Sequence, residues 1–460
     1  MRRPMKVWTV RAAAAAMLAS LAACGGGGGQ TGTAMLNPTN PATVNQCTSA
    51  PRKQALRAYF DDWYFWYQTS PKPDPGNAAS LSDYFESLLS TGSDPAAPAD
   101  RWSYYGSTAA FQQFFTEGQT LGYGLMVNGL ETSGRPDLPL YVRYVEPQSP
   151  AAQAGLVRGD RILSLNGRSA AEVIRAGDLS ALSPAAAGEV LPMQIDHAGE
   201  LRYLTLKAAT YSLQPVTNQR VLSSPQGKRV GYVVVKDMVS QVLQPITDAM
   251  AQFQAAGVSE LVLDLRYNGG GLVSVGRDIA SLIAGSRGAG HAYASLVYND
   301  RKAAQYNTSF DFNAPPQALG LQRVYILTGA RTCSASEQVA NGLRGVLDVV
   351  LVGDTTSCKP VGFNPADDGC GVTYSVVNFE SVNALGQGRY FDGLVPQCAA
   401  NEDFTQALGA GSEPLLAVAL KHADGGGCAA TTASARPRAL SAALHRALVQ
   451  EGERPAMIAR

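Results

Sequence analysis

From about residue 213 to residue 423, short apolar runs alternate with longer segments whose apolar residues recur at helical spacing. The runs that read as strands are Gly231–Val235, Leu261–Leu265, Val324–Leu327 and Val349–Gly353. The segments that read as helices are Val242–Ala256, Val275–Ile283 and Ser336–Leu347. Strands that alternate with helices in this way favour an α/β layered domain for this part of the chain.

Two regions of different character precede this domain. Residues 48–110 carry a dense aromatic face, which includes Tyr59, Phe60 and Trp63, at spacings that predict helices with these rings in their core. Residues 111–212 are punctuated by glycine and contain the alternating segment Tyr141–Val145, which predicts a β-rich domain.

The first residues read as an export signal. Three basic residues precede an apolar stretch from about Val10 to Ala23, which is too short and too alanine-rich for a membrane-spanning helix. The stretch ends in Leu21-Ala22-Ala23-Cys24, which resembles the bacterial lipobox, and this resemblance implies lipidation of Cys24. An ordinary cleaved signal that happens to end in cysteine is the alternative. Residues 25–47, rich in glycine, threonine, asparagine and proline, are expected to be a linker.

Composition argues against several classes of function. Lys+Arg and Asp+Glu are both 37, and the absence of a basic excess argues against a nucleic-acid partner. The four histidines show no metal-binding spacing and no CxxC occurs, so neither a metal nor another cofactor is expected. Six cysteines remain beyond Cys24, enough for up to three disulfides of open connectivity, and a bridge between Cys333 and Cys358 is one hypothesis.

A candidate nucleophile and base occur in the α/β region. Ser334 lies between an expected strand and helix, where backbone N–H groups and the helix dipole favour a developing negative charge. No histidine occurs between His291 and His422, but Lys359 follows the next expected strand, and burial can lower the pKa of a lysine enough to make it a base. Because a strand–helix–strand unit can bring its flanking loops to one sheet edge, we predict a Ser334/Lys359 dyad.

A glycine-rich loop supplies the third element of this chemistry. Asn268-Gly269-Gly270-Gly271 follows a buried strand, so its N–H groups are able to approach a substrate closely. We predict an oxyanion hole formed by the N–H groups of Gly270 and Ala335. A glycine loop taken alone is equally compatible with a plain turn.

These motifs together resemble the C-terminal processing (tail-specific) serine proteases. Residues 264–271, DLRYNGGG, are similar to the family signature "DLRxNxGG", and residues 334–337, SASE, match its nucleophile motif. The separation of Ser334 from Lys359 and the order of the regions also agree with the family. The resemblance, which covers about residues 50 to 423, implies a ClpP/crotonase-like layered α/β protease core with an inserted PDZ-like domain and an N-terminal helical region.

The segment from Ser149 to Gly167 resembles the PDZ pattern "SPAxxAGLxxGDxIxxxNG". Such domains add a peptide as a strand and hold its terminal carboxylate in a loop of backbone N–H groups. The resemblance assigns that loop to Leu121–Leu125, with Gly122, Tyr123, Gly124 and Leu125 as tail-binding residues. A PDZ-like fold with an occluded groove is the alternative. The expected regions are a signal (1–24), a linker (25–47), a helical domain (48–110), a PDZ-like domain (111–212), a protease core (213–423) and a tail (424–460).

Two departures from the family pattern concern the base. Lys359 is flanked by Cys358 and Pro360 rather than by glycines, and the positions where members carry a polar helper hold Gly345 and Phe363. Asp348 and Thr356 are candidate substitutes for this helper. Glu337 matches a family glutamate, which acts either in support of the site or only as a helix N-terminal charge.

The function implied is a serine endopeptidase that cleaves unstructured or C-terminally recognised proteins in the cell envelope. Its partners are protein or peptide substrates with accessible C-termini, and the membrane through the lipid anchor. By resemblance to other bacterial lipoproteins, Gly25 rather than aspartate after Cys24 implies a location on the outer membrane, facing the periplasm. Two alternatives remain: an inactive peptide-binding lipoprotein of the same fold, and a transport or scaffold lipoprotein.

Overall fold

The computed structural model describes residues 34–35, 46–94, 97–357, 359–428 and 456–459. The expected export signal and the lipidation residue Cys24 lie outside these residues, as does Cys358 of the hypothetical Cys333–Cys358 bridge. Within the described residues, no helix combines the length and the apolar character needed to cross a membrane.

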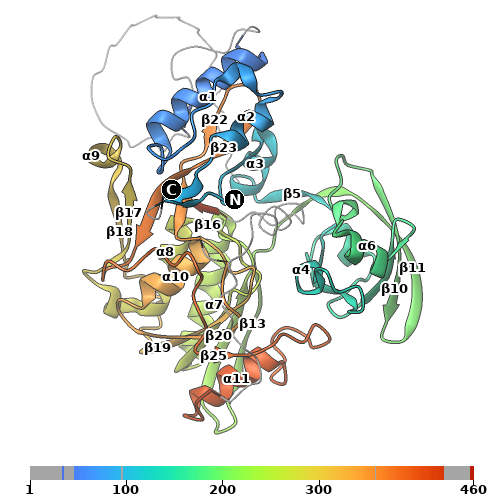
Figure 1. Cartoon of the computed structure of the whole chain (residues 1–460). Coiled ribbons are helices and arrows are strands. Elements are labelled where there is room, and N and C mark those ends of the chain that lie inside the picture. Colours follow the sequence, from blue (N-terminus) through green and yellow to red (C-terminus); the bar gives the residue numbers. More distant parts are fainter. Residues whose placement is uncertain (1–33, 36–45, 95–96, 358, 429–455, 460) are drawn as a thin grey trace, which may run out of the picture. The chain divides into compact units, whose positions relative to one another are not determined.

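The protease core is built on a six-stranded sheet in the order β13-β14-β15-β19-β20-β25 (Figure 1). Its strands are β13 (Val216–Ser223), β14 (Arg229–Val235), β15 (Glu260–Asp264), β19 (Arg323–Thr328), β20 (Asp348–Gly353) and β25 (Cys398–Ala399). The strands from β14 to β25 are parallel, and β13 pairs antiparallel at the edge. This arrangement confirms the α/β layered class expected from the sequence.

Helices cover both faces of this sheet. Val233 and Val235 of β14 belong to a core shared with α7 (Leu243–Ala255), α8 (Val273–Ala284) and α10 (Ala335–Leu343). The alternate residue Tyr232 belongs to a second core with α11 (Pro414–Ala423). Burial on both faces explains why these strands read as continuous apolar runs in the sequence.

A second sheet, in the order β16-β26-β21-β24-β17-β18, stands beside the first. Its strands are β16 (Gly270–Leu272), β26 (Ala456–Ile458), β21 (Val361–Phe363), β24 (Val377–Val382), β17 (Ala292–Tyr298) and β18 (Thr308–Asp311). Strand β26 comes from the region expected to be a separate tail, yet all three of its residues are buried. This part of the tail therefore belongs to the protease core.

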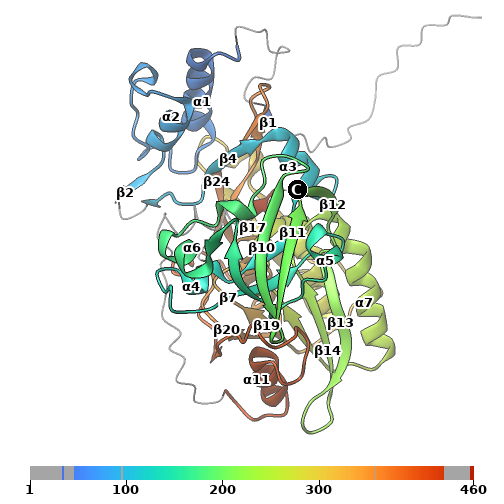
Figure 2. The ribbon, with the colours of Figure 1, turned by 90° about the vertical axis from the view of Figure 1, so that its right-hand side faces the viewer.

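The PDZ-like domain is inserted between two strands that pair with each other. Strand β5 (Gln119–Gly122) leads into it and β12 (Ala209–Ser212) leads out, and the two form an antiparallel ladder. The domain holds a sheet in the order β11-β10-β8-β7-β6 and three helices, and Figure 2 looks onto its β10–β11 hairpin. Its elements are β6 (Leu125–Val127), α4 (Gly129–Thr132), β7 (Leu140–Val145), α5 (Pro150–Gln153), β8 (Arg161–Leu165), β9 (Arg168–Ser169), α6 (Ala170–Ala176), β10 (Val190–His197) and β11 (Glu200–Lys207).

The N-terminal region is only partly helical. Its helices are α1 (Ser49–Trp63), α2 (Leu81–Ser87) and α3 (Thr108–Phe115), but it also contains the strands β2 (Thr91–Asp94), β3 (Ala97–Ala99) and β4 (Tyr104–Ser107). Strand β4 pairs with β23 (Val372–Ser375), and β1 (Ala34–Met35) pairs with β22 (Ala366–Asp367). Rings of the aromatic face pack with Phe363 of β21, so this region covers the segment that follows Lys359.

Two disulfides join distant segments. Cys47, which precedes α1, is bonded to Cys370, and Cys398 of β25 is bonded to Cys428 after α11. A ring nitrogen of His422 lies within 4.8 Å of both sulfurs of the second bridge. Since thiolates are the form of cysteine that binds metals, the disulfide leaves this group of three without its sulfur ligands.

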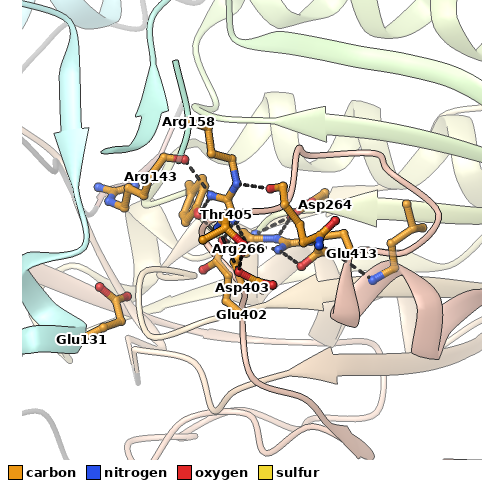
Figure 3. Close-up of polar contacts among 12 residues, drawn as sticks. Glu131, Arg143, Arg158, Asp264, Arg266, Glu402, Asp403, Thr405 and Glu413 are labelled. Carbon is orange, nitrogen blue, oxygen red and sulfur yellow. Dashed lines mark hydrogen bonds and ion pairs between the residues drawn. The ribbon is translucent and has the colours of Figure 1, made fainter. Parts of the chain in front are cut away.

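A buried group of charges holds β15, and with it the glycine loop that follows. Figure 3 shows Arg266 between Asp264 and Glu413. Its Nε donates to Asp264 Oδ1 at 3.0 Å, and its two terminal nitrogens donate to the two carboxylate oxygens of Glu413 at 2.7 and 2.9 Å. Glu402, 3.4 Å from Arg266, also accepts from Arg158 of the PDZ-like domain at 2.8 Å. We call Asp264, Arg266, Glu402 and Glu413 the Arg266 network.

Replacement of Arg266 by alanine should strongly destabilise the protein, because it leaves the buried carboxylates of Asp264 and Glu413 without their cation. The expected loss is about 3–5 kcal/mol of unfolding free energy, which is typical when one partner of a buried ion pair is removed. Arg135→Ala, which breaks an exposed ion pair with Asp137, is the control and should leave the transition unchanged. Denaturant titration compares the variants, and equal midpoints for the two would contradict a structural role of the network.

Candidate active site

Ser334 occupies a sharp turn between β19 and α10. Its backbone has φ +64° and ψ −119°, a conformation that L residues other than glycine rarely adopt. The residue is fully buried, and its N–H donates to Glu337 Oε2 at 2.7 Å. A strained strand-to-helix turn of this kind is a known way to present a nucleophilic serine at the top of a sheet.

Lys359 follows β20, the parallel neighbour of β19, so both loops leave the same edge of the sheet. The Lys359 N–H donates to Glu337 Oε2 at 2.9 Å, the same oxygen atom that accepts from Ser334. The Thr356 hydroxyl donates to the other carboxylate oxygen, and Ser357 N–H donates to Thr332 O at 2.8 Å. The structure thus brings the backbones of the two predicted dyad residues together on one carboxylate.

The surroundings of Lys359 favour its neutral form. Burial lowers the pKa of its amine to about 7, although the nearby Cys333, Asp100 and Glu337 act in the opposite direction. The amine nitrogen lies 3.7 Å from the centre of the Phe363 ring, a contact that also favours the charged form. Desolvation remains the largest effect, so a substantial share of the amine is deprotonated near neutral pH.

The hydroxyl of Ser334 is not hydrogen-bonded to Lys359 in this arrangement. Within the described residues, Ser334 Oγ is buried and has no hydrogen-bond partner. Catalytic hydrogen bonds often form only when substrate is bound. The backbones of the two predicted dyad residues are therefore held together, while no hydrogen bond joins Ser334 Oγ to Lys359.

The predicted oxyanion residues lie beside the nucleophile. A Cβ placed on Gly270 would lie 2.8 Å from the Ala335 nitrogen, and the backbone of Gly270 has φ +100°, so only glycine suits this position. The Gly270 N–H donates to Asn268 Oδ1 at 2.7 Å. A substrate carbonyl has to replace this bond before Gly270 can serve as an oxyanion donor.

Sequence reasoning assigned no role to Asn268, Asp100 or the Phe363 ring. Asn268 is a hub for the nucleophile loop: its carbonyl accepts from Cys333 N–H at 3.1 Å, and its side-chain oxygen accepts from Ser336 Oγ at 2.7 Å. The sequence signal that pointed to Asn268 was its position in residues 264–268, DLRYN, which are part of the run that resembles the family signature. Asp100 comes from the N-terminal region, far from Lys359 in sequence, and no local pattern indicates that it lies near the amine.

The suggested substitutes for the missing polar helper have different positions. Thr356 binds Glu337 and accepts from Leu394 N–H at 2.8 Å, so it contacts the dyad through Glu337. Asp348 begins β20, at the opposite end of the strand from Lys359. Among the two candidates, only Thr356 lies next to the site.

The predicted tail-binding residues line a cavity of about 650 Å³. Gly122, Tyr123, Gly124 and Leu125 form one side, and rings of α3, among them Phe111, form another. In the described residues, the N–H groups of Tyr123 and Gly124 donate no hydrogen bond.

Comparison with family models agrees with this architecture. Residues 229–384 match the model of peptidase family S41, residues 141–196 match a PDZ domain, and residues 52–104 match the N-terminal domain of S41 peptidases. The three matches follow the order of the three regions described above.

Individual relatives are similar over most of the chain. A carboxyl-terminal-processing protease of Synechocystis is 27% identical over 325 residues, which cover 70% of this chain and 71% of that protein. A chloroplastic C-terminal processing peptidase of Tetradesmus obliquus is 27% identical over 355 residues, or 72% and 73% of the two chains. A solved S41 protein from Bacteroides fragilis shares the fold, with a TM-score of 0.62 and 24% identity over 80% of this chain and 97% of its own. The chain belongs to peptidase family S41 and is a serine-type peptidase with a PDZ domain.

Proposed function

We propose that this protein is a Ser334/Lys359 endopeptidase that cleaves unstructured or C-terminally recognised proteins in the cell envelope. The observation that carries the proposal is the shared Glu337 oxygen, which accepts from the N–H groups of both Ser334 and Lys359. A lysine whose pKa is about 7 in such a site is suited to act as a general base.

The proposed reaction proceeds through an acyl-enzyme. Neutral Lys359 takes the proton of Ser334 Oγ as this oxygen attacks the scissile carbonyl, and the N–H groups of Gly270 and Ala335 stabilise the resulting oxyanion. The protonated lysine then gives its proton to the leaving amine. A water molecule, deprotonated by Lys359, hydrolyses the ester and restores Ser334. Glu337 acts as a positioning residue, because its contacts are with the backbone of both dyad members.

Substrate tails are proposed to enter the cavity beside Gly122–Leu125. The N–H groups of Tyr123 and Gly124 suit the terminal carboxylate, and the rings of Phe111 and Phe114 suit apolar side chains of the tail. The PDZ match and the names of the relatives support peptide substrates.

We also propose that Cys24 anchors the protein to the outer membrane, with the enzyme in the periplasm. The lipobox-like sequence supports the anchor, and the disulfides Cys47–Cys370 and Cys398–Cys428 suit an oxidising compartment. Globomycin, which blocks lipoprotein signal cleavage, should cause the unprocessed precursor to accumulate if this anchor is used.

Peptide binding without cleavage is the second candidate function. Ser334 Oγ lacks a hydrogen-bond partner among the described residues, and Phe363 stands where the family resemblance leads us to expect a polar helper for the lysine. Under this alternative the wild-type protein binds tail peptides and leaves an unstructured protein intact.

Removal of either dyad side chain should abolish cleavage of casein, an unstructured substrate. We expect Ser334→Ala and Lys359→Met to lower kcat/KM about a thousandfold or more, since the nucleophile and base act as a unit. Methionine keeps the length of the lysine side chain without its amine. Ser295→Ala and Lys421→Ala, which lie outside the site, are the matched controls and should retain the wild-type rate. Full cleavage by Ser334→Ala would rule out the proposed nucleophile.

Activity should rise with pH through neutrality, because only the deprotonated amine of Lys359 accepts the serine proton. With a pKa of about 7, kcat/KM should increase about tenfold per pH unit below pH 7 and level off above about pH 8. Initial rates between pH 5 and 9, in buffers of constant ionic strength, provide the profile. A rate that falls steadily over this range would show that the protonated lysine is the active form.

A further inference from the structure

Strand β26 lies between the two strands that carry the catalytic loops. It runs parallel to β16, with Ala456 opposite Gly270, Met457 opposite Gly271 and Ile458 opposite Leu272. On its other side it pairs with β21, where Phe363 is opposite Ile458. Since β16 begins in the predicted oxyanion loop and β21 begins two residues after Lys359, β26 spans the gap between the oxyanion loop and the base.

The backbone of Ala456 reaches the turn that holds the nucleophile. A Cβ placed on Gly270 would lie 2.2 Å from Ala456 O, 2.8 Å from Ala335 N and 2.9 Å from Cys333 O. The Ala456 carbonyl oxygen, the Cys333 carbonyl oxygen and the Ala335 nitrogen therefore all lie close to the same side of Gly270. The last two belong to the residues on either side of Ser334. Ala456 N–H donates to Gly269 O at 3.0 Å, which fixes the strand along the glycine loop.

The side chains of β26 are buried as completely as the dyad. Ala456 and Met457 are 0% exposed, as are Ser334 and Lys359. Met457 Sδ accepts from Gln338 of helix α10 at 3.6 Å, and all three side chains join the main hydrophobic core. A substrate strand cannot reach Ser334 along this path while β26 is in place.

The strand also fixes the element against which Lys359 rests. Ala459 N–H donates to Phe363 O at 3.2 Å, and the Lys359 amine lies over the Phe363 ring. In the same arrangement Ser334 Oγ has no hydrogen-bond partner among the described residues. In this structure, β26 occupies the space between β16 and β21, and no hydrogen bond joins Ser334 Oγ to Lys359.

We propose that the slot between β16 and β21 is the site for the substrate strand, and that Ala456–Ile458 of this chain occupies it as an internal inhibitor. The inference rests on the proposed endopeptidase function. The sequence Ala-Met-Ile indicates the preferred ligand: an extended apolar segment with a small residue opposite Gly270. Main-chain pairing supplies the affinity, and the buried pockets around Met457 and Ile458 supply the selectivity.

Two variants that displace the strand test this proposal in different ways. One is shortened to end at Arg454, and the other is the full chain with Met457→Asp, which places a carboxylate in the apolar slot. Each should cleave casein with a kcat/KM about tenfold higher than wild type, because a tethered segment competes at an effective concentration near the millimolar range. Leu201→Asp, which puts the same charge on an exposed PDZ position, should leave the rate unchanged.

The synthetic peptide PAMIAR, which reproduces residues 455–460, should restore inhibition of the shortened variant. Inhibition should raise KM and leave kcat unchanged, as expected for a competitor of substrate. The same peptide with aspartate in place of Met457 should not inhibit. Noncompetitive inhibition would place the peptide outside the substrate slot and overturn the proposal.

Binding measured without catalysis separates this inference from the proposed function. Fluorescein-labelled PAMIAR should bind the shortened Ser334→Ala variant at least about tenfold more tightly than the full-length Ser334→Ala variant. This result would support the slot even if no form cleaves casein, which would refute only the endopeptidase function. A folded shortened variant with an unchanged rate and no peptide binding would overturn the inference. Unfolding of both displaced variants would also overturn it, since β26 would then be a structural strand.

Discussion

The hydrogen bonds of the Glu337 carboxylate hold together the two loops that carry Ser334 and Lys359, the predicted nucleophile and base. This carboxylate is fully buried in the first turn of α10, and it accepts from the N–H of Ser334, the N–H of Lys359 and the hydroxyl of Thr356. Hydrogen bonds in a buried site are electrostatically stronger than in water, and they also fix the orientation of the groups that they join. A single side chain therefore joins the loops that follow β19 and β20 and balances the strain of the turn at Ser334.

Strands and helices that are defined by the residues of one continuous segment were predicted accurately. Gly231–Val235 and Val242–Ala256 became β14 and α7 with boundaries shifted by at most two residues, because apolar spacing alone determines such buried elements. The prediction that Ser334 and Lys359 lie at one sheet edge rested on topology, because parallel neighbouring strands end on the same side. Their catalytic roles remain predictions.

The features that depend on distant segments were not predicted. The pairing of Cys47 with Cys370 accompanies the ion pair between Arg52 of α1 and Asp368 of the β22–β23 turn, and neither contact leaves a trace in local spacing. Residues 456–458 lie in a stretch that reads as a tail, and only their position between β16 and β21 gives them a role. The N-terminal region was expected to be helical because its aromatic residues dominate the pattern, while the short strand β4 forms by pairing with β23.

The antiparallel pairing of β5 with β12 brings the entry and exit of the PDZ-like domain side by side, with Gly122 opposite Ala209. Because its two ends are neighbours, the domain is inserted at a single place in the host fold, and Arg158 joins it to the core a second time through Glu402. The PDZ-like domain can therefore evolve as a separate unit. The sequence of this inserted domain can diverge while the loops after β15, β19 and β20 keep their geometry.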